Sequence, residues 1–214
     1  MVSYYENEEF YQKISLTGNQ ESLYSSIMHK FIEREFNESE NFPKTLEIGS
    51  DQGQHRSFVK HQYTEYIECD LHFPKNQPLD TRVRSVIGDI RKLPFEDNQF
   101  DRVIVTCVLH HLRDPLVAIN EIFRVTKVGG SISILIPKEP SILYFIVRNF
   151  LMYLKHKKLR QVLFFHKLHK QQHLGHYKII IKCIRRHQEL KIGKLRRFPT
   201  ITPTILYCYN LIKV

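Results

Sequence analysis

The sequence predicts a single α/β domain whose core is a doubly wound, mainly parallel β-sheet. The chain has 214 residues, which is enough for one sizeable domain and short for two. Between residues 44 and 137, short apolar runs alternate with stretches of helical character. Strands separated by helices form right-handed βαβ units, and such units build a mainly parallel sheet. The apolar, β-branched run at residues 103–109 suits a strand that is buried on both faces.

Residues 1–40 are predicted to form an N-terminal lid and helix. Residues 1–19 are polar, whereas apolar side chains recur at helical spacing over residues 20–36 and predict an amphipathic helix there. Asn37 to Pro43 then interrupts the pattern.

Residues 44–137 are predicted to hold five strands and the helices between them. The strands are expected at residues 45–48, 65–70, 83–87, 101–109 and 131–137. A short helix is expected at residues 54–60. A longer helix begins at Asp114-Pro115, an N-cap followed by proline at the first helical position, and is expected to end at Gly129-Gly130.

Residues 138–188 are predicted to form a basic helical cap, and residues 189–214 a closing strand pair. Two helices and two strands are expected there, at residues 141–165, 177–187, 190–195 and 205–211. Gly193 interrupts the alternation of the first of these strands, which predicts a β-bulge. The sheet then has seven strands, with an antiparallel C-terminal strand.

Charge is distributed unevenly along the chain. Residues 1–137 hold 15 Lys and Arg against 20 Asp and Glu, whereas residues 138–214 hold 17 Lys and Arg against 2 Glu. Such asymmetry favours an anionic partner for the C-terminal part: a phosphate group, a nucleic acid or an anionic membrane surface. A solvated basic surface without a partner is the alternative.

The sequence favours a cytoplasmic location. The four cysteines are scattered and form no CxxC pair, which is typical of a reducing compartment. The chain begins without a basic segment followed by an apolar one, so no signal peptide is predicted. The longest apolar stretch, residues 142–154, is too short for a membrane span and contains Arg148 and Asn149.

The most informative motif is the run Leu46-Glu47-Ile48-Gly49-Ser50-Asp51-Gln52-Gly53. A strand that leads into glycines lets a ligand approach the backbone closely at the carboxyl edge of a parallel sheet. The dinucleotide fingerprint GxGxxG requires a third glycine where this chain has Gln54, so the spacing excludes that fingerprint.

The remaining pattern, ExGxxxG, resembles that of class I S-adenosylmethionine-dependent methyltransferases, which have a Rossmann-like fold and commonly carry ExGxGxG. Asp51 stands where the family often has a glycine, and Asp tolerates a left-handed backbone better than most residues. Other segments are similar to the group related to ubiquinone and menaquinone methyltransferases, and the resemblance covers residues 44–137. They are Gly88-Asp89-Ile90, Leu93-Pro94-Phe95 through Phe100-Asp101, Val108 to Pro115, and Gly129-Gly130.

The resemblance implies S-adenosyl-L-methionine as the cofactor. In the family pattern, Glu47 anchors the methionyl ammonium, Asp70 accepts the ribose hydroxyls, and Asp89 accepts the adenine amino group. Plain turn or helix caps are the alternative for the two aspartates. The implied cofactor-binding residues are Glu47, Gly49, Ser50, Gly53, Asp70, Leu71, Asp89, Ile90, Thr106 and Cys107.

The implied reaction is an in-line displacement on the sulfonium methyl group by an acceptor atom. Because the methyl is already activated, the protein mainly supplies orientation and electrostatics. An oxygen acceptor benefits from a general base, and His110 and His111, just past the fourth strand, are the candidates. Structural or gating roles for this pair are the alternative.

A second histidine group is spaced along one helical face, at His166, His169, His173 and His176. We predict no metal site there. No Asp or Glu occurs between Glu139 and Glu189, and the intervening Lys167 and Lys170 repel a cation.

The acceptor pocket is expected to form from residues 1–40 and 138–200. There, apolar residues 141–147 run into a cluster of lysines and arginine at 155–160, as in an interfacial membrane anchor or a lid over a phosphorylated acceptor. A core-packing helix is the alternative. The expected partner is an anionic small-molecule or lipid-linked acceptor, with peripheral contact of the basic cap to the inner face of the membrane.

The chain is also similar to small methyltransferases of bacterial surface-polysaccharide clusters. The leading hypothesis is therefore O-methylation of a sugar in a nucleotide- or lipid-linked glycan precursor, a step of polysaccharide biosynthesis. A quinone ring and RNA are alternative acceptors, although the chain lacks the (D/N)PP(Y/F) motif used on base amines. A non-catalytic binding protein is a further alternative, but Glu47, Asp70 and Asp89 are all present.

Overall fold

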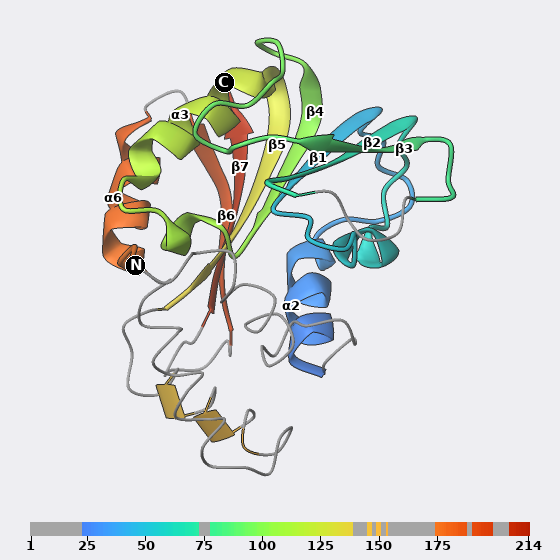
Figure 1. The fold of residues 1–214 in the computed structure, drawn as a ribbon. Helices are drawn as coiled ribbons and strands as arrows, with labels where there is room; N and C mark the ends of the chain where they lie inside the picture. The colour runs from blue at the N-terminus through green and yellow to red at the C-terminus, as the bar shows by residue number, and fades with distance from the viewer. Residues whose placement is uncertain are drawn as a thin grey trace.

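The computed structural model describes residues 23–72, 78–138, 145–146, 149–150, 153, 174–187, 190–198 and 206–214. Its centre is a seven-stranded sheet with the strand order β3-β2-β1-β4-β5-β7-β6 (Figure 1). Six strands run in one direction, and β7 is antiparallel to both of its neighbours. The strands are β1 (Lys44–Ile48), β2 (Glu65–Asp70), β3 (Val83–Ile87), β4 (Phe100–Thr106), β5 (Thr126–Pro137), β6 (Leu190–Phe198) and β7 (Leu206–Lys213). The predicted doubly wound sheet with one antiparallel C-terminal strand is confirmed.

Helices cover both faces of this sheet. Helices α3 (Pro115–Val125) and α6 (Tyr177–Arg186) lie together on one face, and α2 (Leu23–Glu33) lies on the other (Figure 1). Two short 3₁₀ turns, η1 (His55–Phe58) and η2 (Leu109–His111), follow β1 and β4. Among the described residues, no helix is long and apolar enough to cross a membrane.

The two faces of the sheet are chemically different. Successive side chains of a strand point to opposite faces, so β4 sends Val103 and Val105 into the apolar core with α3 and α6. It sends Ile104 and the fully buried Arg102 to the face that α2 covers. The α2 face therefore combines a small apolar cluster with buried polar side chains.

Most predicted elements have the expected limits, and two local signals are confirmed. The backbone N–H of Leu116 donates to Asp114 Oδ1 over 3.1 Å, as expected for an N-cap followed by Pro115. The register of β6 with β7 shifts between Ile192 and Lys194, which places the predicted bulge at Gly193.

Three boundaries were predicted wrongly. Helix α3 ends at Val125, and Gly129-Gly130 lies inside β5, because Thr126 already pairs with Phe100 of β4 and the pairing resumes at Ser131 with Arg102 after a register shift. Strand β4 ends at Thr106, because Cys107 has a φ of 56° and turns the chain into η2. The helix expected at residues 54–60 is the single 3₁₀ turn η1. Most of the helix predicted at residues 141–165 lies outside the described residues.

Candidate cofactor site

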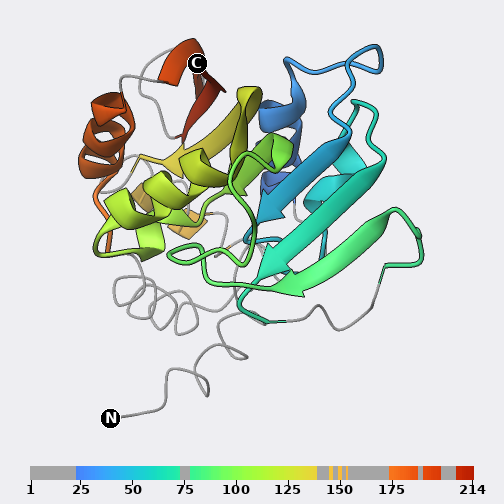
Figure 2. The ribbon, with the colours of Figure 1, turned by 90° about the horizontal axis from the view of Figure 1, so that it is seen from above.

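The loops that follow β1, β2, β3 and β4 meet at one edge of the sheet. The arrows of β1, β2 and β3, blue to green in Figure 2, point in the same direction. In the register of β1, Ile48 pairs with Cys69 of β2 and with Val105 of β4. The N–H of Gly88 donates to the carbonyl of Asp70 over 2.8 Å, which joins the ends of β2 and β3. This carboxyl edge is where ligands bind in open α/β sheets.

The loop after β1 has a left-handed backbone at three positions. Gly49, Asp51 and Gly53 have φ values of 75°, 47° and 71°. A Cβ atom on Gly49 would lie 2.1 Å from Cγ2 of Val108, so no side chain fits there. The N–H of Gly53 donates to the carbonyl of Ser50 over 2.8 Å and closes the turn. The expectation that Asp51 accepts a left-handed conformation is confirmed.

Asp70, at the end of β2, is held by this same loop. Its Oδ2 accepts from the N–H of Asp51 over 2.9 Å, and its Oδ1 accepts from the N–H of Leu71 over 2.7 Å. A carboxylate has about four acceptor positions, so two remain after these bonds. The half-buried side chain is therefore oriented and retains the capacity to accept from a pair of ligand hydroxyls.

Asp89 and Ile90 follow β3 on the neighbouring loop. Asp89 Oδ1 accepts from the N–H of Arg91 over 2.8 Å, and the Arg91 guanidinium pairs with the carboxylate. The hydrogen bond from Arg91 lowers the pKa of Asp89, which keeps this side chain an ionised acceptor. Ile90 is buried and packs into the core beside Leu93.

Thr106 and Cys107 lie at the end of β4. The Oγ1 atom of Thr106 is buried and has no hydrogen-bond partner among the described residues. The Sγ of Cys107 lies 3.9 Å from Sδ of Met28, so α2 covers this end of β4. A buried hydroxyl without a partner is unfavourable, and a polar ligand at the carboxyl edge would satisfy it.

Glu47, the fourth residue of β1, is buried on the α2 face. Its Oε2 accepts from the hydroxyl of Tyr66 over 2.8 Å. Burial raises the pKa of Glu47 to about 8, and the negative charges of Glu68 and Glu33 act in the same direction. The carboxyl group is therefore protonated at neutral pH. A cationic group placed beside it would favour its ionised form.

Substitution of Glu47 by Gln is expected to remove a loss of stability that the original chain undergoes as the pH rises from about 4.5 to about 8. Because the folded-state pKa of Glu47 is raised above its ordinary value of 4.5, folding is progressively disfavoured as the pH rises from 4.5 through 8. The slope is about 1.4 kcal/mol per pH unit at most. Urea unfolding should therefore find Glu47→Gln close to the original chain at pH 5.5 and more stable than it at pH 9. Equal pH dependence of the two chains would contradict a buried, protonated Glu47.

The two predicted catalytic histidines lie in η2, which begins two residues after Cys107. His110 is 4% exposed, and its carbonyl accepts from the N–H of Gly175 over 2.8 Å. His111 is half-buried, and its ring centroid lies 4.1 Å from that of His110. The pair thus stands at the carboxyl edge, with His111 the more accessible of the two.

The sequence did not predict the buried polar group beneath α2, which consists of Ser25, His29, Glu33, His55 and Arg102. All five side chains are at most 7% exposed. The spacing of Ser25, His29 and Glu33 at i, i+4 and i+8 is the one signal that could have shown a polar stripe on the buried face of this helix.

Two surface cavities lie beside the C-terminal half of α2, away from the carboxyl edge. The larger, of about 480 Å³, is lined by Phe31, Arg34, Glu35 and residues 194–197. The smaller, of about 350 Å³, is lined by residues of α2 and by Ser57 to Lys60. Neither contains a predicted cofactor-binding residue. The candidate site is therefore defined by the strand register and the loop geometry of the carboxyl edge.

Within the part of the chain that the structure describes, no group of three or more His, Cys, Asp or Glu side chains is arranged to hold a metal ion. Of the histidine series considered above, His176 caps the start of α6, where its Nδ1 accepts from the N–H of Lys178 over 3.1 Å. His166, His169 and His173 lie outside the described residues.

Comparisons with known proteins identify similar methyltransferases. A family model described as a methyltransferase domain matches residues 46–134. An uncharacterised protein of Methanocaldococcus jannaschii is 28% identical over 141 residues, covering 65% of this chain and 60% of that protein. The demethylmenaquinone methyltransferase of Staphylococcus aureus is 43% identical over 60 residues, covering 28% of this chain and 25% of that enzyme. The chain thus spans less than two thirds of the length of these curated relatives.

Solved structures share the fold at low sequence identity. The N-methyltransferase NodS of Bradyrhizobium japonicum superposes with a TM-score of 0.62 at 13% identity, covering 90% of this chain and 98% of that one. The matched segment, residues 46–134, contains the left-handed loop, both aspartates and the end of β4. Residues 46–134 therefore match a methyltransferase domain, and the chain has the fold of solved S-adenosylmethionine-dependent methyltransferases.

Proposed function

We propose that this chain transfers the methyl group of S-adenosylmethionine to an oxygen of a sugar in a nucleotide- or lipid-linked glycan precursor. The methyl-transfer part of this proposal is supported by the arrangement of residues at the carboxyl edge of the sheet. There, the left-handed loop at Gly49 to Gly53 is bonded to Asp70 and lies next to β4. The last residue of β4, Thr106, has a buried hydroxyl for which the described part of the chain provides no partner.

The residues of this edge fit the cofactor chemically. The close backbone of Gly49, Ser50 and Gly53 would pack against it, and Asp70 beside Leu71 has two acceptor positions left for ribose hydroxyls. Asp89 would accept from the adenine amino group with Ile90 beside the ring. Thr106, Cys107 and Glu47 would serve the methionyl end. When bound, the cofactor supplies a methyl group already activated by a sulfonium, so the protein's task is to orient it and to remove a proton from the acceptor.

Charge and exposed apolar side chains support an anionic, membrane-associated acceptor. Helix α6 presents Lys178, Lys182 and Arg185 to solvent, and residues 138–214 carry 17 basic against 2 acidic side chains. Several apolar side chains of residues 145–153, which precede α6 by more than 20 positions, are 45–59% exposed: Phe145, Ile146, Phe150 and Tyr153. Basic and apolar groups together suit a peripheral position at the cytoplasmic face of an anionic membrane.

A quinone ring is the second candidate acceptor, since the name of the S. aureus relative specifies demethylmenaquinone. That similarity covers 28% of this chain, so it supports a shared cofactor-binding region more than a shared acceptor. RNA is favoured only by the net positive charge of the C-terminal part.

Replacement of Asp70 by Ala is expected to weaken the binding of S-adenosylmethionine about 10–100-fold, because two hydrogen bonds to the ribose are lost. Isothermal titration calorimetry on the purified chain measures this directly, with NAD as a negative control. Asp80→Ala is the matched variant, since Asp80 is a half-buried aspartate that pairs with Arg82 and precedes the first residue of β3, at the opposite end of that strand from Asp89. Equal weakening by both variants, or failure of the folded chain to bind, would overturn the assignment of the site.

The acceptor is identified by transfer of a radiolabelled methyl group. Nucleotide sugars, a bacterial membrane extract containing polyprenyl-linked sugars, demethylmenaquinone and total RNA are each incubated with the enzyme and labelled cofactor. Label in the sugar fractions supports the proposal. Label confined to the quinone or to RNA replaces the proposed acceptor with that class.

A further inference from the structure

A cavity with a basic lining lies where the C-terminal end of α2 meets β6. Its volume is about 480 Å³, within the range of about 300–1,000 Å³ that is usual for small-molecule sites. Strand β6 is the last strand in the order of the sheet, so the cavity lies at a sheet edge that no further strand of the described residues covers. We call it the basic cavity, and it is lined by Phe31, Arg34, Glu35 and residues 194–197.

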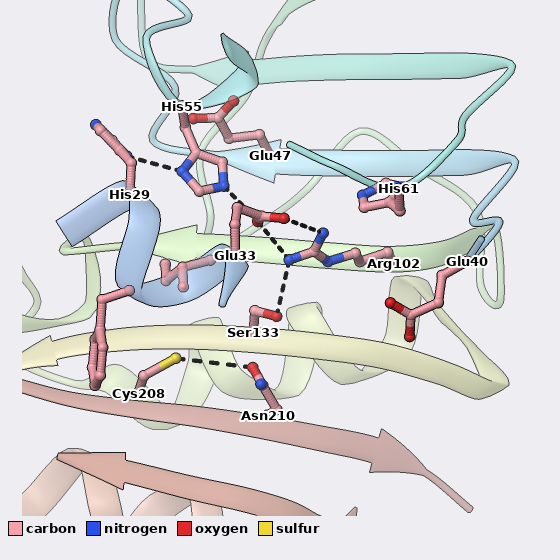
Figure 3. Close-up of polar contacts among 12 residues, drawn as sticks. His29, Glu33, Glu40, Glu47, His55, His61, Arg102, Ser133, Cys208 and Asn210 are labelled. Atoms are coloured by element: carbon pink, nitrogen blue, oxygen red, sulfur yellow. Dashed lines mark hydrogen bonds and ion pairs between the residues drawn. The ribbon is translucent and has the colours of Figure 1, made fainter. Parts of the chain in front are cut away.

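The strand register places two cations of β6 on the same face of the sheet as α2. Lys194 pairs with Asn210 of β7, and Arg196 pairs with Cys208. Figure 3 shows Cys208 and Asn210 on the face that α2 covers, where Cys208 packs in the apolar cluster with residues of that helix. Directly paired residues of antiparallel strands project to the same face. Lys194 and Arg196 therefore face the end of α2.

Arg196 is the buried cation of the basic cavity. Its side chain is 9% exposed, and its guanidinium donates to the carbonyl of Phe31 and, over 3.0 Å, to that of Ile32. These carbonyls belong to the last turn of α2, where unsatisfied oxygens carry the negative end of the helix dipole. Arg196 thus neutralises a feature of the helix end that would otherwise repel an anion.

Glu35 is the single acidic side chain among the residues that line the basic cavity, and two cations hold it. Its Oε2 accepts from Nζ of Lys194 over 2.7 Å, and its Oε1 lies 3.7 Å from Nε of Arg196. The other two cations, Arg34 and Arg197, are exposed, and neither has a hydrogen bond or an ion pair within the described part of the chain. The lining therefore has four basic side chains against one acidic side chain, and two of the cations are available to an anion.

We propose that the basic cavity binds a phosphate or diphosphate group. Arg34 follows directly after α2 and Arg197 belongs to β6, so the cations reach the cavity from two separate elements. A phosphate has oxygens that point in several directions, and it can accept hydrogen bonds from both elements at once. A carboxylate has only two oxygens, and a single arginine satisfies both of them. The arrangement therefore favours a phosphate over a carboxylate.

An apolar cluster lies between the basic cavity and the end of β4. Phe31 lines the cavity, and its ring centroid lies 5.7 Å from that of Phe198, the last residue of β6. Both rings pack in one cluster with Met28, which contacts Cys107. Met28 precedes Phe31 by about 4.5 Å along the helix axis. An acceptor with its phosphate in the basic cavity can therefore extend along this cluster toward the methionyl end of the candidate cofactor site. That source of the phosphate rests on the proposed function, and the headgroup of a membrane lipid is the other source.

The first test needs neither the cofactor nor an acceptor. Pyrophosphate is titrated into the ¹⁵N-labelled chain at constant ionic strength, and the backbone amide shifts report where it binds. We expect saturable shifts at Arg34, Glu35 and residues 194–197, and none in the loop from Gly49 to Gly53. Shifts that do not saturate, or that are absent from the basic cavity, would overturn the proposal.

Variants of exposed or half-buried residues test the charges without disturbing the core. Arg34→Gln and Arg197→Gln should each weaken pyrophosphate binding at least about tenfold, the loss expected for one hydrogen bond to a charged group. Glu35→Gln should instead tighten it several-fold, because it removes the acidic lining residue and releases Lys194. Arg186→Gln is the matched control, since Arg186 is exposed in the same basic part of the chain but lies on α6. Equal weakening by Arg186→Gln would show attraction to net charge alone and would overturn the site.

A last pair of measurements identifies the source of the phosphate. If it belongs to the acceptor, Arg34→Gln should raise KM for the sugar acceptor found in the methyl-transfer screen about tenfold and change kcat little. If it belongs to a lipid headgroup, Arg34→Gln should reduce cosedimentation with vesicles of phosphatidylglycerol and phosphatidylcholine, and pyrophosphate should release the unaltered chain from them. Should the chain transfer no methyl group to any acceptor, the proposed function fails, whereas the pyrophosphate and vesicle measurements still decide whether the basic cavity is a phosphate site.

Discussion

Replacement of Arg102 by Met is expected to lower the free energy of unfolding by about 3–5 kcal/mol, because it leaves a buried carboxylate without its partner. The side chains of Arg102 and Glu33 are both fully buried. The guanidinium also stacks over the ring of Phe36, with 3.5 Å between its central carbon and the ring centroid. Urea unfolding at pH 7.5 measures the loss as a shift of the midpoint at constant slope.

Two further variants separate charge burial from packing. Replacing both Glu33 and Arg102 by Met removes the unpaired charge, so the double variant should be more stable than Arg102→Met alone. Arg82→Met breaks an exposed pair with Asp80 and should change stability by less than about 1 kcal/mol. Additive losses in the double variant would mean that Glu33 and Arg102 do not interact in the folded chain.

The cofactor edge could be predicted because its signals are local in the sequence. Each parallel strand is a short apolar run, and each candidate cofactor-binding residue lies near the end of its strand or a few positions after it, as Asp70 ends β2 and Gly49 follows β1. Once the strands are parallel, their carboxyl ends share an edge whatever the details of packing. Even a backbone conformation could be predicted in this way: the left-handed backbone of Asp51 was expected from its residue type and its position in the ExGxxxG pattern.

The buried polar group beneath α2 could not be predicted because it is assembled by packing. His55 is 22 residues from Glu33 in the sequence, and Arg102 is 69 residues away. Arginine is rarely buried, so the residue type gives no reason to expect Arg102 inside a buried strand. The burial of Arg102 is explained only by the carboxylate of Glu33, which α2 places beside it. The end of α3 was predicted wrongly for a similar reason, because it also depends on contacts between distant segments. Gly129-Gly130 is a good helix stop, but the pairing of Thr126 with Phe100 extends β5 through it.

Replacement of Gly49 by Ala is expected to abolish measurable binding of S-adenosylmethionine and to destabilise the fold by about 2–5 kcal/mol. A left-handed backbone with a side chain accounts for about 1–2 kcal/mol of this, and overpacking for about 1–3 kcal/mol. The overpacking arises because the new Cβ would lie 2.1 Å from Cγ2 of Val108. To relieve that contact, the loop must move away from Val108 and distort the turn that Asp70 holds. Calorimetric titration with the cofactor and urea unfolding measure the two effects.

Gly129 supplies the matched control, because its φ of 78° is nearly the same and a Cβ there would meet nothing within 4 Å. Gly129→Ala should therefore show only the backbone part of the loss, about 1–2 kcal/mol, with cofactor affinity unchanged. Adding Val108→Ala to Gly49→Ala removes Cγ2 and should recover part of the stability. The affinity for the cofactor should recover only to the extent that the loop regains its position beside Asp70. Normal binding by Gly49→Ala alone would show that the tight loop after β1 is not what holds the cofactor.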